Sequence, residues 1–240
     1  MEIKIFNATA KQLEKTKCPV FIGISVGVKP MSKQIALSYM EWAEKHSTGT
    51  IPILIADKIA KFNYLAFSHY TKPGSLSRAI RDGDKYQVFF DDVFKQLPAN
   101  RHQRFKVIRW ENIESPRFFK CLDRVTQEFQ KNIDFQKTVL SYAEKYIERR
   151  NKIIAEEKKT FLGQYILHEL VVLLDGIYTN EKNYNLIVYP TYRDSGMSGL
   201  IRDIQAGIKF PSLKKDLNLK KTIMAECIIP WGTVGALGSK

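Results

Sequence analysis

Apolar residues occur along this chain in two patterns, short runs of strand length and longer stretches with a helical repeat. The short runs predict buried β-strands, at 17–24, 51–57, 105–110, 185–189 and 223–229. Apolar positions three and four residues apart predict helices, at 31–46, 73–97, 116–134, 135–159, 160–174 and 194–206. Ser75 is a candidate N-cap for the second of these helices. Strands that alternate with helices predict an α/β fold whose central sheet is parallel, at least in its core.

Three polar side chains fall where predicted strands end: Ser25, Asp57 and Tyr189. Parallel strands of one sheet have their carboxyl ends at the same edge, and ligands of open α/β sheets bind beyond that edge. We therefore expect these three residues to mark the functional site.

Ser25 stands between two glycines in the segment Gly23–Gly27, after an apolar run and before a predicted helix. Glycines permit a tight turn, and the start of a helix offers N–H groups that favour developing negative charge. The segment therefore suits a serine nucleophile. The same G-x-S-x-G pattern occurs in α/β-hydrolases, which also need a late histidine, and the only late one here is His168. A serine that merely caps a helix is the other explanation.

Tyr165 and Glu169 are four residues apart in a mostly apolar helix, so they lie on one helix face. A carboxylate among apolar neighbours needs a partner. A substrate ammonium would be one such partner, and a nearby Lys or Arg at the helix surface would be another. The phenol of Tyr189 could pass a proton or hold an oxyanion, or it could be a core tyrosine with its hydroxyl at the rim.

The chain has 240 residues, 44% of them hydrophobic, which fits a single catalytic domain over 1–240 with 235–240 as a tail. No apolar run has the length of a membrane span, and the N-terminus lacks the layout of a signal peptide. We therefore expect a cytoplasmic protein without a membrane partner. The three cysteines and four histidines are widely spaced, which predicts neither a disulfide framework nor a metal site.

Charge is the strongest bulk signal. The chain has 38 Lys and Arg against 25 Asp and Glu, a net charge of +13, which favours nucleic acid as a partner. Arg78, Arg81 and Lys85 share one helix face and suit a phosphate backbone. The cluster at 149–152 and the lysine pairs at 214–215 and 220–221 are alternatives. A basic enzyme with no nucleic-acid partner is the competing explanation.

Together these motifs resemble those of the tRNA-dependent cyclodipeptide synthases, in residue type, order and separation. The resemblance rests on Gly23–Gly27, the pair Tyr165 and Glu169, and Tyr189 at a strand end, and it covers about 19–191. The basic helix is sparser than in some members of that family.

Three positions indicate a branch of the family. One branch has Asn three residues after the serine and Tyr-His at the strand end, and the other has a variable residue and Tyr-Pro. Val28 and the dipeptide Tyr189-Pro190 resemble the second branch. The chain departs from the pattern at Phe118, where some members have an active-site tyrosine, and at Val171, where many have proline.

The resemblance implies a single Rossmann-like domain, similar to the catalytic domain of class I tyrosyl- and tryptophanyl-tRNA synthetases. It implies an aminoacyltransferase that makes a diketopiperazine from two aminoacyl-tRNAs by a ping-pong mechanism. Ser25 would carry first an aminoacyl and then a dipeptidyl group. The ester arrives activated, so neither cofactor nor metal is expected, and nothing demands more than a monomer.

The resemblance also implies residue roles. Tyr165 and Glu169 would hold the first α-ammonium, and Tyr189 would relay a proton during cyclisation. The substrate-binding residues would be Gly23, Val28, Ile53, Val172, Ile187 and Pro190, and the tRNA-binding residues Arg78, Arg81 and Lys85. A serine hydrolase of the α/β type and a non-catalytic tRNA-binding protein remain the alternatives.

Overall fold

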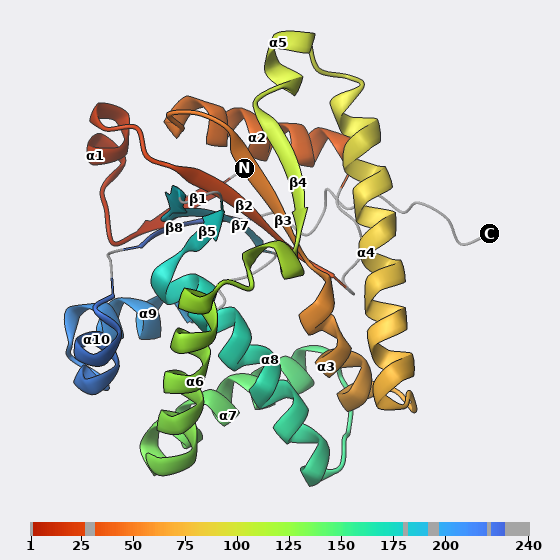
Figure 1. Ribbon diagram of the computed structural model, residues 1–240, viewed down its shortest axis with the longest axis vertical. Helices are drawn as coiled ribbons and strands as arrows, with labels where there is room; N and C mark the ends of the chain where they lie inside the picture. The colour runs from red at the N-terminus through yellow and green to blue at the C-terminus, as the bar shows by residue number, and fades with distance from the viewer. Residues whose placement is uncertain (1, 27–31, 180–181, 192–196, 220–221, 229–240) are drawn as a thin grey trace.

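A six-stranded sheet forms the centre of the computed structural model, which describes residues 2–26, 32–179, 182–191, 197–219 and 222–228 (Figure 1). The strand order is β1-β8-β7-β2-β3-β4. The strands are β1 (Glu2–Phe6), β2 (Val20–Ser25), β3 (Ile51–Ala56), β4 (Phe105–Arg109), β7 (Leu186–Thr191) and β8 (Ile223–Ile228). All neighbours pair in parallel except β1, which runs antiparallel to β8. The prediction of a mainly parallel α/β sheet is confirmed.

Helices cover both faces of this sheet. The longer elements are α2 (Lys33–His46), α3 (Asp57–Phe67), α4 (Lys72–Phe94), α6 (Pro116–Lys131), α7 (Ile133–Arg149), α8 (Glu156–Asp175) and α9 (Met197–Ala206). The shorter ones are α1 (Ala10–Lys15), α5 (Ala99–His102), the 3-10 helix η1 (Trp110–Ile113), α10 (Pro211–Leu217) and a hairpin of β5 (Ile177–Thr179) and β6 (Lys182–Tyr184). In the described ranges, no helix is long and apolar enough to span a membrane.

Alternate residues of the central strands enter two separate hydrophobic clusters. Ile22 and Ile53 pack in a cluster with side chains of α2 and α4. Phe21, Leu54 and Ile187 pack in the other, with side chains of α6, α7, α8 and α9. Both faces of the sheet are therefore buried, which explains why the strands are almost continuously apolar in sequence.

Helix α3 is the main element that the sequence pattern did not predict. The β3 run was expected to end at Asp57, but Asp57 is the first residue of α3. Helix α4 then begins earlier than expected, because the Thr71 hydroxyl accepts from the Gly74 amide and serves as the N-cap. Ser75 lies one turn inside the helix, where its hydroxyl donates to the carbonyl of Lys72 at 2.8 Å.

Two further boundaries differ from the prediction. Helix α7 ends at Arg149 and α8 starts at Glu156, so the break precedes the expected position by several residues. Asn151 adopts a left-handed conformation there, with φ of 48°. Pro190 does not end its strand, because it lies within β7 and pairs in register with β8.

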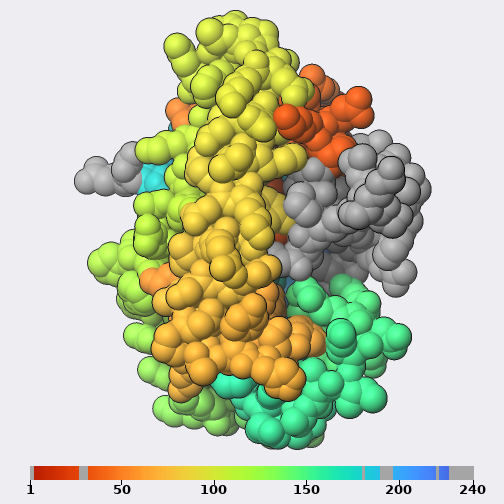
Figure 2. All heavy atoms as spheres, turned by 90° about the vertical axis from the view of Figure 1, so that its right-hand side faces the viewer, coloured from red at the N-terminus to blue at the C-terminus, as the bar shows by residue number. Residues whose placement is uncertain are grey.

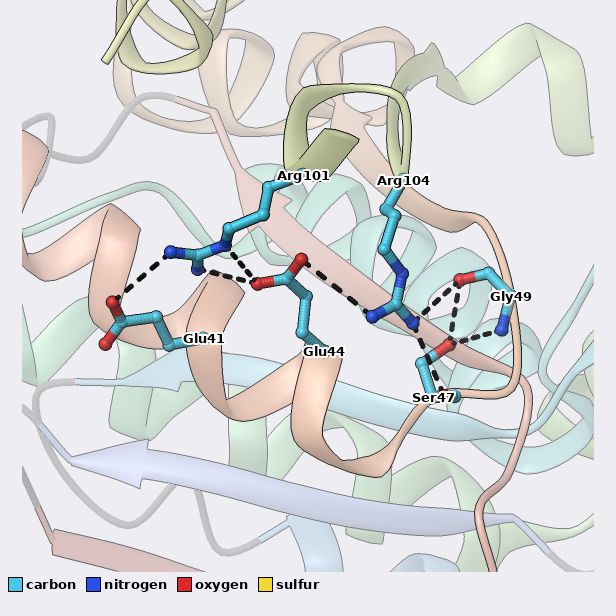
Figure 3. A network of polar contacts seen from close by, with 6 residues as sticks. All are labelled: Glu41, Glu44, Ser47, Gly49, Arg101 and Arg104. Atoms are coloured by element: carbon cyan, nitrogen blue, oxygen red, sulfur yellow. Dashed lines mark hydrogen bonds and ion pairs between the residues drawn. The ribbon is translucent and has the colours of Figure 1, made fainter. Parts of the chain in front are cut away.

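A polar network joins α5 to α2 at the amino-terminal side of the sheet (Figure 3). Arg101 donates to Glu44 at 2.6 Å and lies 3.8 Å from Glu41. Arg104 donates to the carbonyl oxygens of Ser47 and Gly49. The carbonyl of Arg104 also accepts from the amide of Ile51, the first residue of β3. This network holds the beginning of β3, at the opposite end of the strands from Ser25.

Candidate functional site

Ser25 and Tyr189 meet at the carboxyl ends of the neighbouring strands β2 and β7. The Ser25 Oγ lies 2.8 Å from the Tyr189 hydroxyl oxygen. The Tyr189 ring reaches Ser25 by passing over Gly23, where a Cβ would lie 3.3 Å from the ring carbon Cδ2. The absence of a side chain at Gly23, two residues before Ser25, therefore leaves space for the tyrosine ring, in addition to any role of this glycine in the turn.

Helix α8 brings Glu169 and Tyr165 to the same place. The Tyr189 hydroxyl donates to Glu169 Oε1 at 2.7 Å. Burial raises the pKa of the Glu169 carboxyl above its usual value, and the hydrogen bond from Tyr189 opposes that rise. The partner that the structure gives Glu169 is thus a tyrosine of the site, rather than a lysine or arginine at the helix surface.

Both tyrosines keep their protons at neutral pH. Burial raises the pKa of Tyr165 well above its usual value, and the Glu169 charge raises it further, while a hydrogen bond with Ser25 opposes the rise. The pKa of Tyr189 is raised by the same two causes in the same order. A tyrosine has one proton to donate, and Tyr189 donates it to Glu169. The Ser25 hydroxyl must then donate to the Tyr189 oxygen, which gives a directed chain from serine to carboxylate.

Three of the residues expected around the first amino acid lie on one side of the sheet, and a fourth does not. Gly23, Val172 and Ile187 belong to the side of the sheet that α8 covers. Ile53 does not, because it pairs with Ile22 and packs on the opposite face. Its place beside Gly23 is taken by Leu54, which pairs with Gly23 in register.

For two other expected substrate-binding residues, Val28 and Pro190, the structure describes no side-chain contacts. Val28 lies outside the described residues. Pro190 is described through the backbone of β7 only.

Asp57 was expected at the site and is a structural residue instead. It is 1% exposed, and its carboxylate accepts from Arg109 Nε at 2.6 Å and from the Trp110 amide at 3.1 Å. Arg109 also pairs with Asp84 at 2.8 Å, which attaches β4 to α4. This arrangement explains Gly83 in the middle of α4, since a Cβ there would lie 2.6 Å from Arg109 Nη2.

The predicted tRNA-binding row on α4 is partly engaged within the protein. Arg78 and Lys85 each donate to the Asp82 carboxylate at 2.7 Å, and Tyr64 donates to it at 2.5 Å. Burial raises the pKa of Asp82, but the hydrogen bonds from Lys85, Tyr64 and Arg78 outweigh it and lower the pKa overall. Arg81 is exposed on the same helix. The row therefore presents less net charge than its three cations suggest.

His168 lies away from Ser25. Its Nδ1 is 2.8 Å from the carbonyl oxygen of Gln164, and its ring packs against Phe62 on α3 with centroids 5.1 Å apart. Ser25 interacts with Tyr189 and with Tyr165, so the histidine needed for a hydrolase triad is not supplied by His168. Among the described residues, no group of three His, Cys, Asp or Glu side chains could hold a metal ion.

Sequence reasoning missed two residues near the site. Leu54 could have been found from strand alternation, because residues that pair in register with Gly23 and Ser25 face the same way. Tyr146 on α7 lies parallel to Tyr165, with ring centroids 6.5 Å apart and an angle of 4° between the planes. Its helical spacing gave no reason to place it beside α8.

Comparison with known proteins identifies relatives of this chain. Residues 2–198 match the sequence model of the cyclodipeptide synthase family. The structure is similar to a cyclodipeptide synthase from Bacillus thermoamylovorans (TM-score 0.68, 15% identity, 95% of this chain and 94% of that chain covered). It is also similar to one from Fluoribacter dumoffii (TM-score 0.68, 18% identity, coverage 93% and 96%). No curated protein matches in sequence.

A more distant likeness extends to tRNA synthetases. Tryptophanyl-tRNA synthetase from Plasmodium falciparum superposes with a TM-score of 0.54 at 9% identity, covering 91% of this chain and 53% of that chain. The fold is Rossmann-like and related to the class I synthetases, as expected from the resemblance.

Proposed function

Because the chain belongs to the cyclodipeptide synthase family, we propose that it is an aminoacyltransferase that forms a diketopiperazine from two aminoacyl-tRNAs. The main support for placing this reaction at Ser25 is the chain of hydrogen bonds from Ser25 through Tyr189 to Glu169 (the Ser25 contact chain). It gives a nucleophile a route for its proton without a histidine.

The first step transfers an aminoacyl group to the enzyme. Ser25 Oγ attacks the ester carbonyl, and its proton moves to the Tyr189 oxygen while the Tyr189 proton moves to Glu169. The bond to the ribose oxygen breaks, and that oxygen takes the relayed proton as the tRNA leaves, which restores the Glu169 carboxylate. One ester bond forms and one breaks, so the step needs no external energy.

Three further steps convert the enzyme ester into the product. The amine of a second aminoacyl-tRNA attacks the carbonyl on Ser25, which releases Ser25 and leaves the dipeptidyl group esterified to that tRNA. Ser25 then attacks this new ester and displaces the tRNA, giving the dipeptidyl-enzyme. The free amine of the dipeptide then attacks the ester on Ser25, closing the six-membered ring. The amine loses a proton and the Ser25 oxygen regains one, and Tyr189 lies at the right distance to relay it.

Tyr165 and Glu169 would hold the α-ammonium of the first aminoacyl group. An ammonium beside Glu169 would favour its charged form against burial, which suits a carboxylate whose pKa is raised in the free protein. The adjoining surface is apolar, with Leu54, Val172 and Ile187 on the face that α8 covers. We therefore expect an apolar first amino acid.

The place of action follows from the substrate. Aminoacyl-tRNA is a cytoplasmic molecule, and each member of the Ser25 contact chain comes from the same polypeptide. We expect the chain to act in the cytoplasm as a monomer, without metal or cofactor, because the ester is already activated.

Product analysis tests the proposal. The purified chain is incubated with tRNA charged with labelled amino acids, and extracts are examined for diketopiperazines by mass spectrometry. We expect a product with the wild type and none with Ser25→Ala. Ser38→Ala is the matched control, since Ser38 is exposed on α2. Equal product from Ser25→Ala would refute a covalent role for Ser25, and no diketopiperazine from any tRNA mixture would refute the reaction.

A further inference from the structure

Asn63 of α3 carries a buried carboxamide whose oxygen lacks a hydrogen-bond donor among the described residues. The residue is 6% exposed, and no group in the described ranges donates to its Oδ1. Buried polar groups are nearly always paired, because an unpaired one destabilises the folded protein. An apolar side chain at this position would avoid that cost, so we expect the amide to serve a ligand rather than the fold.

Asn63 faces away from β4. Asp57, the first residue of α3, accepts from Arg109 of β4. Lys58, the next residue, donates to Glu114, just after η1. Asn63 is five and six residues further along α3, so at about 100° per residue it points about half a turn away from the mean direction of these two. Because β4 and β2 lie on opposite sides of β3, Asn63 is on the β2 side, which carries the proposed nucleophile.

The packing of α3 against α8 places Asn63 at the height of Glu169. Phe62, the residue before Asn63, packs against His168, the residue before Glu169, with ring centroids 5.1 Å apart. One residue adds only about 1.5 Å along a helix axis, so Asn63 and Glu169 lie at similar heights above the sheet. Further from the sheet, the end of α3 stays beside the start of α8, orange beside green in Figure 2.

We propose that the Asn63 carboxamide binds the attacking amine of the second aminoacyl-tRNA. The inference rests on the proposed function, which places the first α-ammonium at Tyr165 and Glu169 and leaves the second amine without a partner. A carboxamide has an oxygen that accepts and a nitrogen that donates, and rotation about its terminal bond exchanges the two at little cost. The side chain can therefore turn its oxygen outward and accept from an N–H of this amine.

A neutral acceptor suits the second amine better than a carboxylate would. This amine needs a free electron pair when it attacks the ester on Ser25. A carboxylate favours the charged ammonium form of a nearby amine, whereas a carboxamide carries no charge and orients the N–H with far less preference for that form. In the step, the nitrogen bonds to the carbonyl carbon and the bond from that carbon to Ser25 Oγ breaks. The proton that the nitrogen loses reaches Oγ through Tyr189.

A two-stage assay tests Asn63→Leu, which removes the amide and keeps a side chain of similar size. Enzyme in excess over one aminoacyl-tRNA first forms the ester on Ser25, followed by intact-protein mass spectrometry. An excess of a second aminoacyl-tRNA is then added, and the loss of the ester into diketopiperazine is timed. We expect unchanged ester formation and about tenfold slower ester loss, the effect of one neutral hydrogen bond. Asn100→Leu, exposed on α5, is the control and should match the wild type in both stages.

Four results would overturn the inference. Equal rates of ester loss in Asn63→Leu and the wild type would exclude a contact with the second substrate, and slower ester formation would move the contact to the first. A lower urea midpoint in Asn63→Leu would show that the amide oxygen has a donor within the protein.

The fourth result concerns the ribose hydroxyl beside the ester, which is the other donor of the second substrate near Ser25. A second tRNA ending in 2′-deoxyadenosine lacks this hydroxyl. If it slows ester loss about tenfold in the wild type and causes no further loss in Asn63→Leu, the hydroxyl is the partner of Asn63 and the amine is not. Failure of the proposed function would appear separately, as the absence of any ester on Ser25 in the wild type.

Discussion

Replacing Gly23 by alanine should separate activity from stability. Gly23 is not in a left-handed conformation, so alanine fits its backbone, and the added Cβ would meet Tyr189 Cδ2 at 3.3 Å and Cε2 at 3.7 Å. The shorter distance is tighter than an ordinary van der Waals contact, so the ring must move by a few tenths of an ångström. Its hydroxyl is bound at 2.8 Å to Ser25 and at 2.7 Å to Glu169. The ring cannot move without disturbing the contact chain.

The two consequences have different sizes. Glycine inside a strand costs about 0.5–1 kcal/mol relative to alanine, which offsets part of the steric cost, so the free energy of unfolding should change by less than about 1 kcal/mol. Misplacement of a reacting group by about 1 Å costs about 100-fold in rate. A shift of a few tenths of an ångström should then lower kcat by about tenfold.

The assay compares diketopiperazine formation with urea unfolding. Gly199→Ala in α9 is the control, because a Cβ there meets nothing within 4 Å. It should stabilise the helix by up to about 1 kcal/mol and leave the rate unchanged. Full activity in Gly23→Ala would refute the argument, as would a loss of stability large enough to account for the lost rate.

Three other changes test the electrostatics and packing. The folded-state pKa of Glu169 is raised, so the folded state binds more protons than the unfolded one, and stability falls as pH rises from about 4.5 through the folded-state pKa. Glu169→Gln should remove this dependence, so within that window its free energy of unfolding should rise relative to that of the wild type by up to about 1.4 kcal/mol per pH unit. Urea unfolding at several pH values measures this difference, and parallel curves of stability against pH for the two proteins would contradict it. Asp82→Asn releases Arg78 and Lys85 and should steepen the salt dependence of tRNA binding by about 0.7 to 0.9 for each released cation that contacts a phosphate; a filter-binding slope equal to that of the wild type would exclude this. Gly83→Ala places a Cβ 2.6 Å from Arg109 Nη2 and should destabilise the fold by about 1–3 kcal/mol, and an unchanged urea midpoint would show that the arginine relocates freely.

The members of the Ser25 contact chain could be chosen from the sequence because each of them is tied to a local pattern. Ser25 and Tyr189 end apolar runs, and Glu169 is an acid in an apolar helix, so strand ends and helical spacing sufficed to choose them. The contact between Ser25 and Tyr189 then follows from parallel strands that end at one edge, whereas the contact with Glu169 depends on the packing of α8 against the sheet.

The residues that were misplaced depend on register and on long-range partners. Ile53 and Leu54 are both apolar and adjacent, and a one-residue change of register exchanges the two faces of the sheet. Asp57 was expected to mark the functional site at a strand end, and its structural role could not be seen because its partner Arg109 lies on another strand, 52 residues away. Helix α3 was not predicted, because no turn residues separate it from β3 and it begins at Asp57 itself.

The basic row shows the same limit for charge. Helical spacing placed Arg78 and Lys85 on one face, but it did not show that Asp82, on the same face, accepts hydrogen bonds from both. Counting charges along a helix gives the composition of a face and leaves open which cations are already paired.

The central claim is that Ser25 carries the aminoacyl group. Intact-protein mass spectrometry after acid quench, with a single species of aminoacyl-tRNA, measures this directly. We predict a mass increase of one aminoacyl residue, located by proteolysis to the peptide that contains Ser25 and absent from Ser25→Ala. An adduct that persists in Ser25→Ala, or diketopiperazine formation at full rate in that variant, would contradict the account.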